Sequence, residues 1–264
     1  MKQVLTYEDP EGNTTISRFG SFLAWRDQNK IEVAPRDEAG TCKICGGFGV
    51  VRTKQWGAIR CLCEIETETA RLSLQLREYR SVYVPKDFDD ITLWGTPESK
   101  RSLSEFRKSI LKWLDWPDYW LTIIGMTGTG KTLAMESIAN HFKTWCLYVT
   151  ATDFEAYLGR LMDNQDGEET LTEFLDAVKY APLLIFDDLG SEYQKAGRDW
   201  VKANLRKIID FRYLRPNEYP TIITTNLNED RLREYDMRIG SRILDTQLVD
   251  IISLSNVGDY RRLR

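Results

Sequence analysis

From about residue 90 onward, the chain alternates short apolar runs with longer segments of helical periodicity. The apolar runs occupy residues 121–124, 146–150, 183–186 and 221–225, and their length is typical of buried strands. Apolar residues at helical spacing predict helices over residues 98–114, 132–143, 151–162, 171–179 and 197–212. This alternation predicts an α/β fold, with a parallel sheet that carries helices on both faces.

The pattern ahead of residue 80 is different. Residues 1–40 are polar and mixed, and residues 64–80 have a helical pattern that Val84-Pro85 breaks. We therefore expect an N-terminal region over residues 1–80 and a larger domain over residues 81–264. A chain of 264 residues suits one sizeable domain with a small appendage.

Cysteines mark the N-terminal region. Four of the five cysteines form two pairs, Cys42 with Cys45 and Cys61 with Cys63. The segments 50–52 and 58–60 between the pairs alternate like two strands of a ribbon. Such clustering in an intracellular chain indicates a metal site, and four thiolates suit a structural Zn²⁺ in a zinc ribbon over residues 42–63. An iron–sulfur cluster and plain structural thiols are the alternatives.

Composition bears on location and partners. The net charge is −4, and no apolar run approaches the ~20 residues that a membrane span requires. The N-terminus turns acidic before any apolar stretch forms, so it does not resemble a secretory signal. We expect a soluble cytoplasmic protein with no membrane partner, and the acidic balance argues against nonspecific coating of nucleic acid.

Residues 125–132 carry the clearest chemical motif. The segment reads Gly125-Met126-Thr127-Gly128-Thr129-Gly130-Lys131-Thr132, which is the complete P-loop pattern G-x-x-x-x-G-K-[ST] between a predicted strand and a predicted helix. Gly128 and Gly130 let backbone N–H groups curl around phosphate oxygens at the positive end of the helix. We expect Lys131 to reach the β- and γ-phosphates of ATP and the Thr132 hydroxyl to bind Mg²⁺.

Two further strands end in polar residues suited to hydrolysis. Asp187 and Asp188 follow the strand at 183–186, and ligands of open α/β sheets collect at such carboxyl ends. We expect Asp187 to hold Mg²⁺, directly or through water, and Asp188 to act on the attacking water as general base. Asn226 ends the next strand, where it can orient that water. Turn formation alone also explains such residues, but the P-loop favours the catalytic interpretation.

The order and spacing of four motifs resemble one family. The motifs are residues 187–192 (DDLGSE), 208–213 (IIDFRY), 224–227 (TTNL) and 240–245 (GSRILD). Together they look like the DnaC/DnaI family, the bacterial replicative helicase loaders of the AAA+ class, over residues 82–264. The cysteine-rich segment also resembles the zinc-bearing helicase-binding module of DnaI-type loaders.

The resemblance implies roles for two arginines and a set of partners. Arg242 falls where the family places its arginine finger, which reaches the γ-phosphate held by a neighbouring subunit and so implies a homo-oligomer. Arg261 falls where the family keeps a sensor arginine on its own nucleotide, with Arg262 as the alternative. The family's activity implies loading of a hexameric replicative helicase onto single-stranded DNA, with slow, Mg²⁺-dependent ATP hydrolysis that DNA stimulates.

A candidate DNA contact and two rival functions complete the prediction. The helix at 197–212 carries a basic stripe of Arg198, Lys202, Arg206 and Lys207, which in a ring of subunits could follow a single strand. A solvated helix face explains the stripe equally well. The rival functions are an IstB-like ATPase that assists a transposase on duplex DNA, and a nucleotide-switched adaptor.

Overall fold

The computed structural model describes the chain in several stretches. These are residues 5–8, 14–17, 37–43, 50–53, 57–60, 63, 95–115, 117, 119–142, 146–163, 170–191 and 199–260. In the N-terminal region, β1 (Leu5–Glu8) pairs with β2 (Thr14–Ser17), and β3 (Val50–Thr53) pairs with β4 (Gly57–Arg60), both antiparallel. Val51 lies opposite Ile59, so the strand pairing predicted for the segments 50–52 and 58–60 is confirmed.

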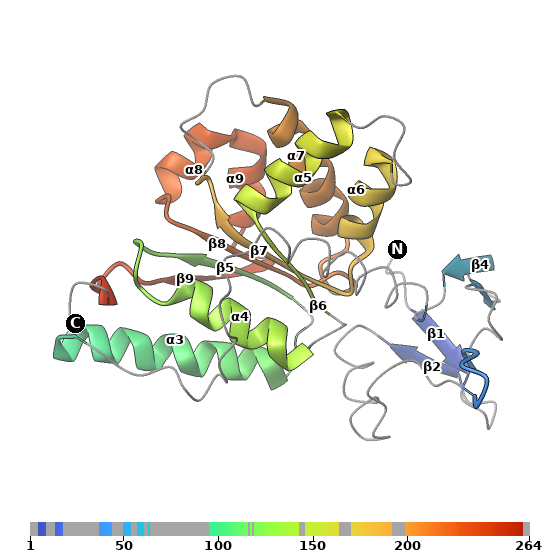
Figure 1. Ribbon diagram of the computed structural model, residues 1–264. Helices are drawn as coiled ribbons and strands as arrows, with labels where there is room; N and C mark the ends of the chain where they lie inside the picture. The colour runs from blue at the N-terminus through green and yellow to red at the C-terminus, as the bar shows by residue number, and fades with distance from the viewer. Residues whose placement is uncertain are drawn as a thin grey trace.

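The remaining strands form one parallel sheet (Figure 1). They are β5 (Trp120–Ile124), β6 (Cys146–Thr150), β7 (Leu183–Leu189), β8 (Thr221–Thr225) and β9 (Val249–Ser253). Their order across the sheet is β6-β7-β8-β5-β9, and each neighbouring pair is parallel. Because β7, β8 and β5 are adjacent, the residues that follow these three strands meet at the same edge of the sheet.

Helices cover both faces of this sheet, as predicted (Figure 1). One face carries α3 (Pro97–Asp115) and α4 (Lys131–Phe142). The other carries α5 (Ala151–Asp163), α6 (Leu171–Tyr180), α7 (Asp199–Tyr213), α8 (Glu229–Tyr235) and α9 (Met237–Ile243). Within the described ranges, no helix is long and apolar enough to cross a membrane.

The sheet separates two hydrophobic cores. Leu183 and Ile185 of β7 belong to the core beneath α3 and α4, while Leu184 and Phe186 belong to the core beneath the other helices. This follows from the strand geometry, in which successive side chains point to opposite faces. A strand buried on both faces therefore reads as a continuous apolar run, which is the pattern seen in the sequence.

Arg212 fastens the amino-terminal end of β8 to the end of α6, and it is wholly buried. Its Nε donates to Thr221 Oγ1 at 2.8 Å. Its remaining nitrogens donate to the carbonyl oxygens of Val178, Lys179, Ala181 and Pro220. Burial lowers the pKa of Arg212 to about 9, so the group stays charged at neutral pH and complements the carbonyl end of α6.

Candidate nucleotide site

The P-loop is anchored at its start from two directions. Gly125 N donates to Thr225 O of β8 at 3.1 Å, and Leu254 N, just past β9, donates to Ile124 O at 2.7 Å. These bonds hold the end of β5 between the strands on either side of it. The loop therefore leaves the sheet from a fixed point, and α4 begins directly after it at Lys131.

Glycines shape the loop where the motif requires them. Gly128 and Gly130 have φ values of 83° and 93°, a region that side chains with a Cβ atom rarely adopt. Between them, Thr129 is buried and its hydroxyl donates to Met126 O at 2.9 Å, which braces the turn from inside. Thr127 and Thr132 are exposed, so the Thr132 hydroxyl is accessible at the first turn of α4.

Lys131 lies inside the loop with 6% of its surface exposed. Its ammonium group donates to Gly125 O at 2.6 Å, to Met126 O at 3.0 Å and to Asn226 Oδ1 at 2.7 Å. Two of these three acceptors are neutral carbonyls of the loop and the third is a neutral amide. These three hydrogen bonds fix the ammonium group in position inside the loop.

Asn226 joins Lys131 to Asp188. Its Nδ2 donates to Asp188 Oδ1 at 2.5 Å, while its Oδ1 accepts from Lys131. Asp188 has φ of 61°, in the left-handed region, and its backbone N–H donates to Thr224 Oγ1 at 2.9 Å. The pairing of β7 with β8 shifts register at this point. The irregular backbone turns Asp188 towards the loop, so three residues predicted from separate motifs lie in one hydrogen-bonded chain.

Asp187 is 1% exposed and accepts a hydrogen bond on each carboxylate oxygen. Thr224 Oγ1 donates to Oδ1, and the Tyr148 hydroxyl donates to Oδ2 at 2.7 Å. Sequence reasoning missed both partners. Tyr148 belongs to the apolar run of β6. The signal that the sequence offered was a polar hydroxyl group within that run.

The residues present fit a magnesium ion. A carboxylate offers about four acceptor positions, so the two hydroxyls leave Asp187 able to accept a hydrogen bond from a metal-bound water or to coordinate the metal directly. Thr132 supplies an accessible hydroxyl oxygen at the start of α4. Mg²⁺ prefers oxygen ligands and keeps several of its waters, so one carboxylate and one hydroxyl beside a phosphate are a suitable protein contribution.

The segment after β9 lies on the P-loop. Tyr260 N donates to Gly128 O at 3.0 Å, and a Cβ atom at Gly128 would overlap the carboxylate of Asp259. Ser99 Oγ of α3 donates to Asn256 O at 3.0 Å and holds the segment from the other side. The predicted sensor Arg261 and its alternative Arg262 lie outside the described residues, directly after this contact.

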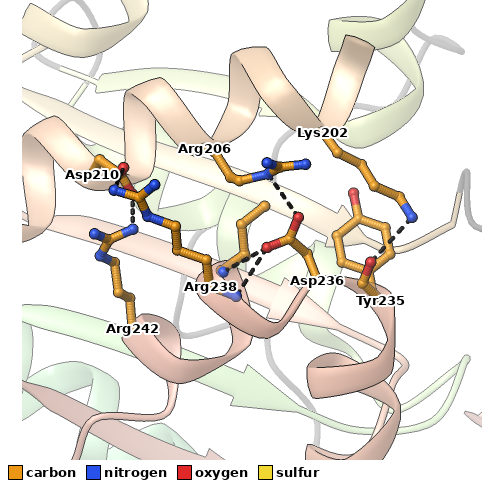
Figure 2. A network of polar contacts seen from close by, with 8 residues as sticks. Lys202, Arg206, Asp210, Tyr235, Asp236, Arg238 and Arg242 are labelled. Carbon is orange, nitrogen blue, oxygen red and sulfur yellow. Dashed lines mark hydrogen bonds and ion pairs between the residues drawn. The ribbon is translucent and has the colours of Figure 1, made fainter. Parts of the chain in front are cut away.

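Arg242 folds back onto α7 of its own chain (Figure 2). Its guanidinium pairs with Asp210 Oδ1, and Arg238 Nη2 lies 2.8 Å from the second oxygen of the same carboxylate. The Arg242 side chain is 18% exposed and that of Arg238 is 63% exposed. Burial lowers the pKa of Arg242. The predicted finger is therefore held in an ion pair, one helical turn from a more exposed arginine on α9.

Two members of the predicted basic stripe hold helices together. Arg206 Nε lies 2.8 Å from Asp236 Oδ2, and Asp236 also caps α9 through Oδ1 (Figure 2). Lys202 Nζ donates to Tyr235 O at 3.1 Å and lies over the tyrosine ring. Lys207 is exposed and bonds to a neighbour on α7, and Arg198 lies outside the described residues. Packing of α7 against α8 and α9 accounts for Lys202 and Arg206.

Half of the predicted zinc set lies outside the described residues, namely Cys45 and Cys61. Cys42 and Cys63 are buried, at 2% and 7% exposure. Among the described residues, no group of three or more histidine, cysteine or acidic side chains could hold a metal ion.

Comparison with known proteins agrees with the site. Residues 121–248 match the family described as "ATPase family associated with various cellular activities (AAA)". Two curated relatives come from Bacillus subtilis (strain 168). The chain is 27% identical to the uncharacterized protein YqaM over 129 residues and 27% identical to the replicative helicase loader DnaI over 120 residues. These alignments cover 47% and 44% of the chain, but only 39% and 35% of the two relatives.

A solved structure shares the fold. AMPPCP-bound DnaA from Aquifex aeolicus superimposes with a TM-score of 0.51 at 19% identity, covering 69% of this chain and 54% of that one.

Proposed function

We propose that this chain is an ATPase that loads a hexameric replicative helicase onto single-stranded DNA during replication initiation, because its residues 121–248 match the AAA family of ATPases. One observation carries the ATPase part of the proposal, the hydrogen-bonded chain from Lys131 through Asn226 to Asp188. The relationship to the helicase loader DnaI supports the loading part.

In the proposed reaction, Lys131 exchanges its bonds with the loop carbonyls for oxygens of the β- and γ-phosphates. Asp188 accepts a proton from the attacking water, which Asn226 orients. The water oxygen bonds to the γ-phosphorus as the bond to the β–γ bridging oxygen breaks and ADP leaves. Mg²⁺, held through Asp187 and Thr132, would supply charge stabilisation to the phosphates. Gly125, Thr127, Gly128, Thr129 and Gly130 form the backbone cradle.

Arg242 is proposed to act in trans. To reach the γ-phosphate in a neighbouring subunit it must leave Asp210, so oligomerisation replaces one charge pair by another. Arg261 is proposed to contact the subunit's own nucleotide, and its neighbour Tyr260 already bonds to the P-loop. Hydrolysis by the isolated subunit is then slow, because full activity depends on assembly. DNA would stimulate hydrolysis by bringing subunits together.

The proposed division of labour places partner binding in residues 1–80 and ATP hydrolysis in residues 81–264. A Zn²⁺ held by Cys42, Cys45, Cys61 and Cys63 would keep the partner-binding module folded. The β3–β4 ribbon between the two cysteine pairs supports this placement. Elemental analysis of the purified full chain tests the metal, with one zinc per chain expected and iron or no metal contradicting it.

The deciding experiment mixes the purified protein with the replicative helicase of its host. Size-exclusion chromatography with light scattering measures the complex, with and without ATP and single-stranded DNA. A stable complex that the double substitution Cys42→Ser, Cys45→Ser abolishes, with ATP binding intact, supports a loader with a zinc-dependent helicase contact. Filaments or rings on duplex DNA without any helicase complex would favour the transposase-assisting function. Helicase binding without any ATP hydrolysis would favour the adaptor.

A further inference from the structure

Tyr148 gives Asp187 one of its two hydrogen bonds, and the atoms fix its direction. Asp187 is 1% exposed and Tyr148 is 3% exposed, so the 2.7 Å bond between them is closed to solvent. An ionised carboxylate can only accept, so the phenol must donate. Thr224 Oγ1 accepts from Asp188 N and donates to the other oxygen of Asp187, which leaves Tyr148 as the second donor.

The sheet register explains how Tyr148 reaches this carboxylate. Tyr148 pairs with Ile185, and Thr150 pairs with Asp187 two positions further along both strands. Residues two apart on a strand share a face, so Tyr148 and Asp187 point to the same side of the sheet. The long aromatic side chain leans along β6 towards the carboxyl end of β7, where its oxygen meets Asp187.

The Tyr148 ring lies in the core beneath the P-loop helix. It belongs to the same hydrophobic cluster as Ala134, Met135 and Ile138 of α4. One side chain therefore packs with the helix that follows the P-loop and hydrogen-bonds to the aspartate of the neighbouring strand. The relative placement of α4 and Asp187 depends on where this ring sits.

We propose that Tyr148 is a positioning residue for Asp187, holding its carboxylate in the orientation in which it serves Mg²⁺ bound with ATP. This inference rests on the proposed ATPase function. The hydroxyl occupies one acceptor position of Oδ2 and, together with Thr224 Oγ1 on Oδ1, fixes the plane of the carboxylate. Outer-shell hydrogen bonds of this kind typically change metal affinity by about 10- to 100-fold when they are removed.

The test is Tyr148→Phe in the full chain, with a fluorescent, non-hydrolysable ATP analogue as probe. Affinity for the analogue is measured in EDTA and across a Mg²⁺ titration. We expect the affinity in EDTA to match that of the wild type, and the Mg²⁺ concentration for half-maximal tightening to rise about 10-fold. Tyr213→Phe is the matched control, because it removes another tyrosine–aspartate bond, to Asp245, and should leave both values unchanged.

A second arm asks whether Tyr148 acts through Asp187. In the Asp187→Asn background, adding Tyr148→Phe should cause no further change in the Mg²⁺ requirement, whereas independent effects would multiply. Tyr148→Met lacks the hydroxyl and fills the ring site differently. It should give the same result as Tyr148→Phe, with unchanged affinity for the analogue in EDTA and a raised Mg²⁺ requirement.

The outcomes separate this inference from the proposed function. An unchanged Mg²⁺ requirement in Tyr148→Phe, or an equal loss of affinity with and without Mg²⁺, would overturn the positioning role. A wild-type protein that does not bind the analogue would instead overturn the proposed ATPase.

Discussion

The nucleotide site and the α7–α9 arginine network hold their charged side chains with different kinds of partner. In the site, Lys131 bonds to two backbone carbonyls and an amide, and Asp187 bonds to two hydroxyls. In the network, charge meets charge, because Asp210 pairs with both Arg238 and Arg242. The residues of the nucleotide site lie at the ends of strands in a buried sheet. The arginine network joins helices through charged side chains that are partly exposed.

The difference teaches what each region can do. Hydrogen bonds to carbonyl, amide and hydroxyl groups fix a charged group in position, ready to interact with a phosphate or a metal ion. A direct ion pair at a partly exposed position is weakened by water and salt and can be exchanged for another partner. The nucleotide site is thus suited to constant geometry, and the arginine network is suited to exchange when subunits meet.

The largest expected effect is on turnover, from Asp188→Asn. Asparagine keeps the size of the side chain and tolerates the left-handed backbone, but it cannot accept the proton of the attacking water. We expect ATP hydrolysis to fall by ~10⁴-fold, the upper end of what a positioned general base contributes. Phosphate release measures the rate, and equilibrium nucleotide binding should persist. Asp250→Asn, at an exposed position of β9, is the control. Hydrolysis at the wild-type rate would remove Asp188 from the reaction.

Arg242→Ala comes next and tests the exchange directly. On its own, Arg242→Ala should lower the rate of ATP hydrolysis by ~10³-fold, because the assembled subunits then lack the arginine finger. Lys131→Ala should also be inactive, since it lacks the phosphate-binding lysine. Mixed together, the two variants should recover activity, because an intact Lys131 site then meets an intact Arg242 from the other subunit. A mixture as inactive as its components would place the action of Arg242 within one chain.

Asp236→Ala should affect stability more than turnover. Its Oδ1 accepts from the backbone N–H groups of Arg238 and Ile239, and its Oδ2 pairs with Arg206. Loss of an N-cap costs about 0.5–2 kcal/mol of the free energy of unfolding, measured by urea denaturation. Arg206→Ala, which removes only the ion pair, should cost less than ~1 kcal/mol. Equal costs for the two variants would show that the cap contributes nothing beyond the pair.

The smallest expected effect comes from Asp210→Asn, and salt should govern it. We expect a change below ~1 kcal/mol in the free energy of unfolding, because the side chains of Asp210, Arg238 and Arg242 are all partly exposed. The difference from the wild type should shrink between ~0.05 M and ~1 M NaCl as the Debye length falls. A difference that does not respond to salt would mean that packing, and not charge, holds Arg242 to α7.

Local pattern was enough to predict much of the fold. The strands β6 and β8 have the predicted bounds, and α4 follows the P-loop, because short apolar runs and glycines report on their own surroundings. The helices α8 and α9 were missed, since seven residues span fewer than two turns and show little periodicity. The strand β9 was missed because only Val249 in it is buried.

Contacts between segments far apart in the chain could not be predicted from the sequence. The bond from Tyr148 to Asp187 depends on β6 lying beside β7, and the pairing of Asp210 with Arg242 depends on how α7 crosses α9. The motifs identified residue types at the ends of strands, but the order of strands in the sheet decides which of them touch. Asn226 illustrates this, since its link to both Lys131 and Asp188 needs β8 to lie between β5 and β7.

The contact of Tyr260 with Gly128 has a consequence for how the protein is made. The strand that leads into the P-loop lies between β8 and β9, and the loop itself bonds to a residue more than a hundred positions later. A ribosome delivers β8 only after residue 225 and Tyr260 later still, so the growing chain carries its glycine loop without these contacts while the intervening residues are made. Nucleotide present during translation should therefore do little to guide early folding, and should first protect the chain from proteases after residue 260 has emerged.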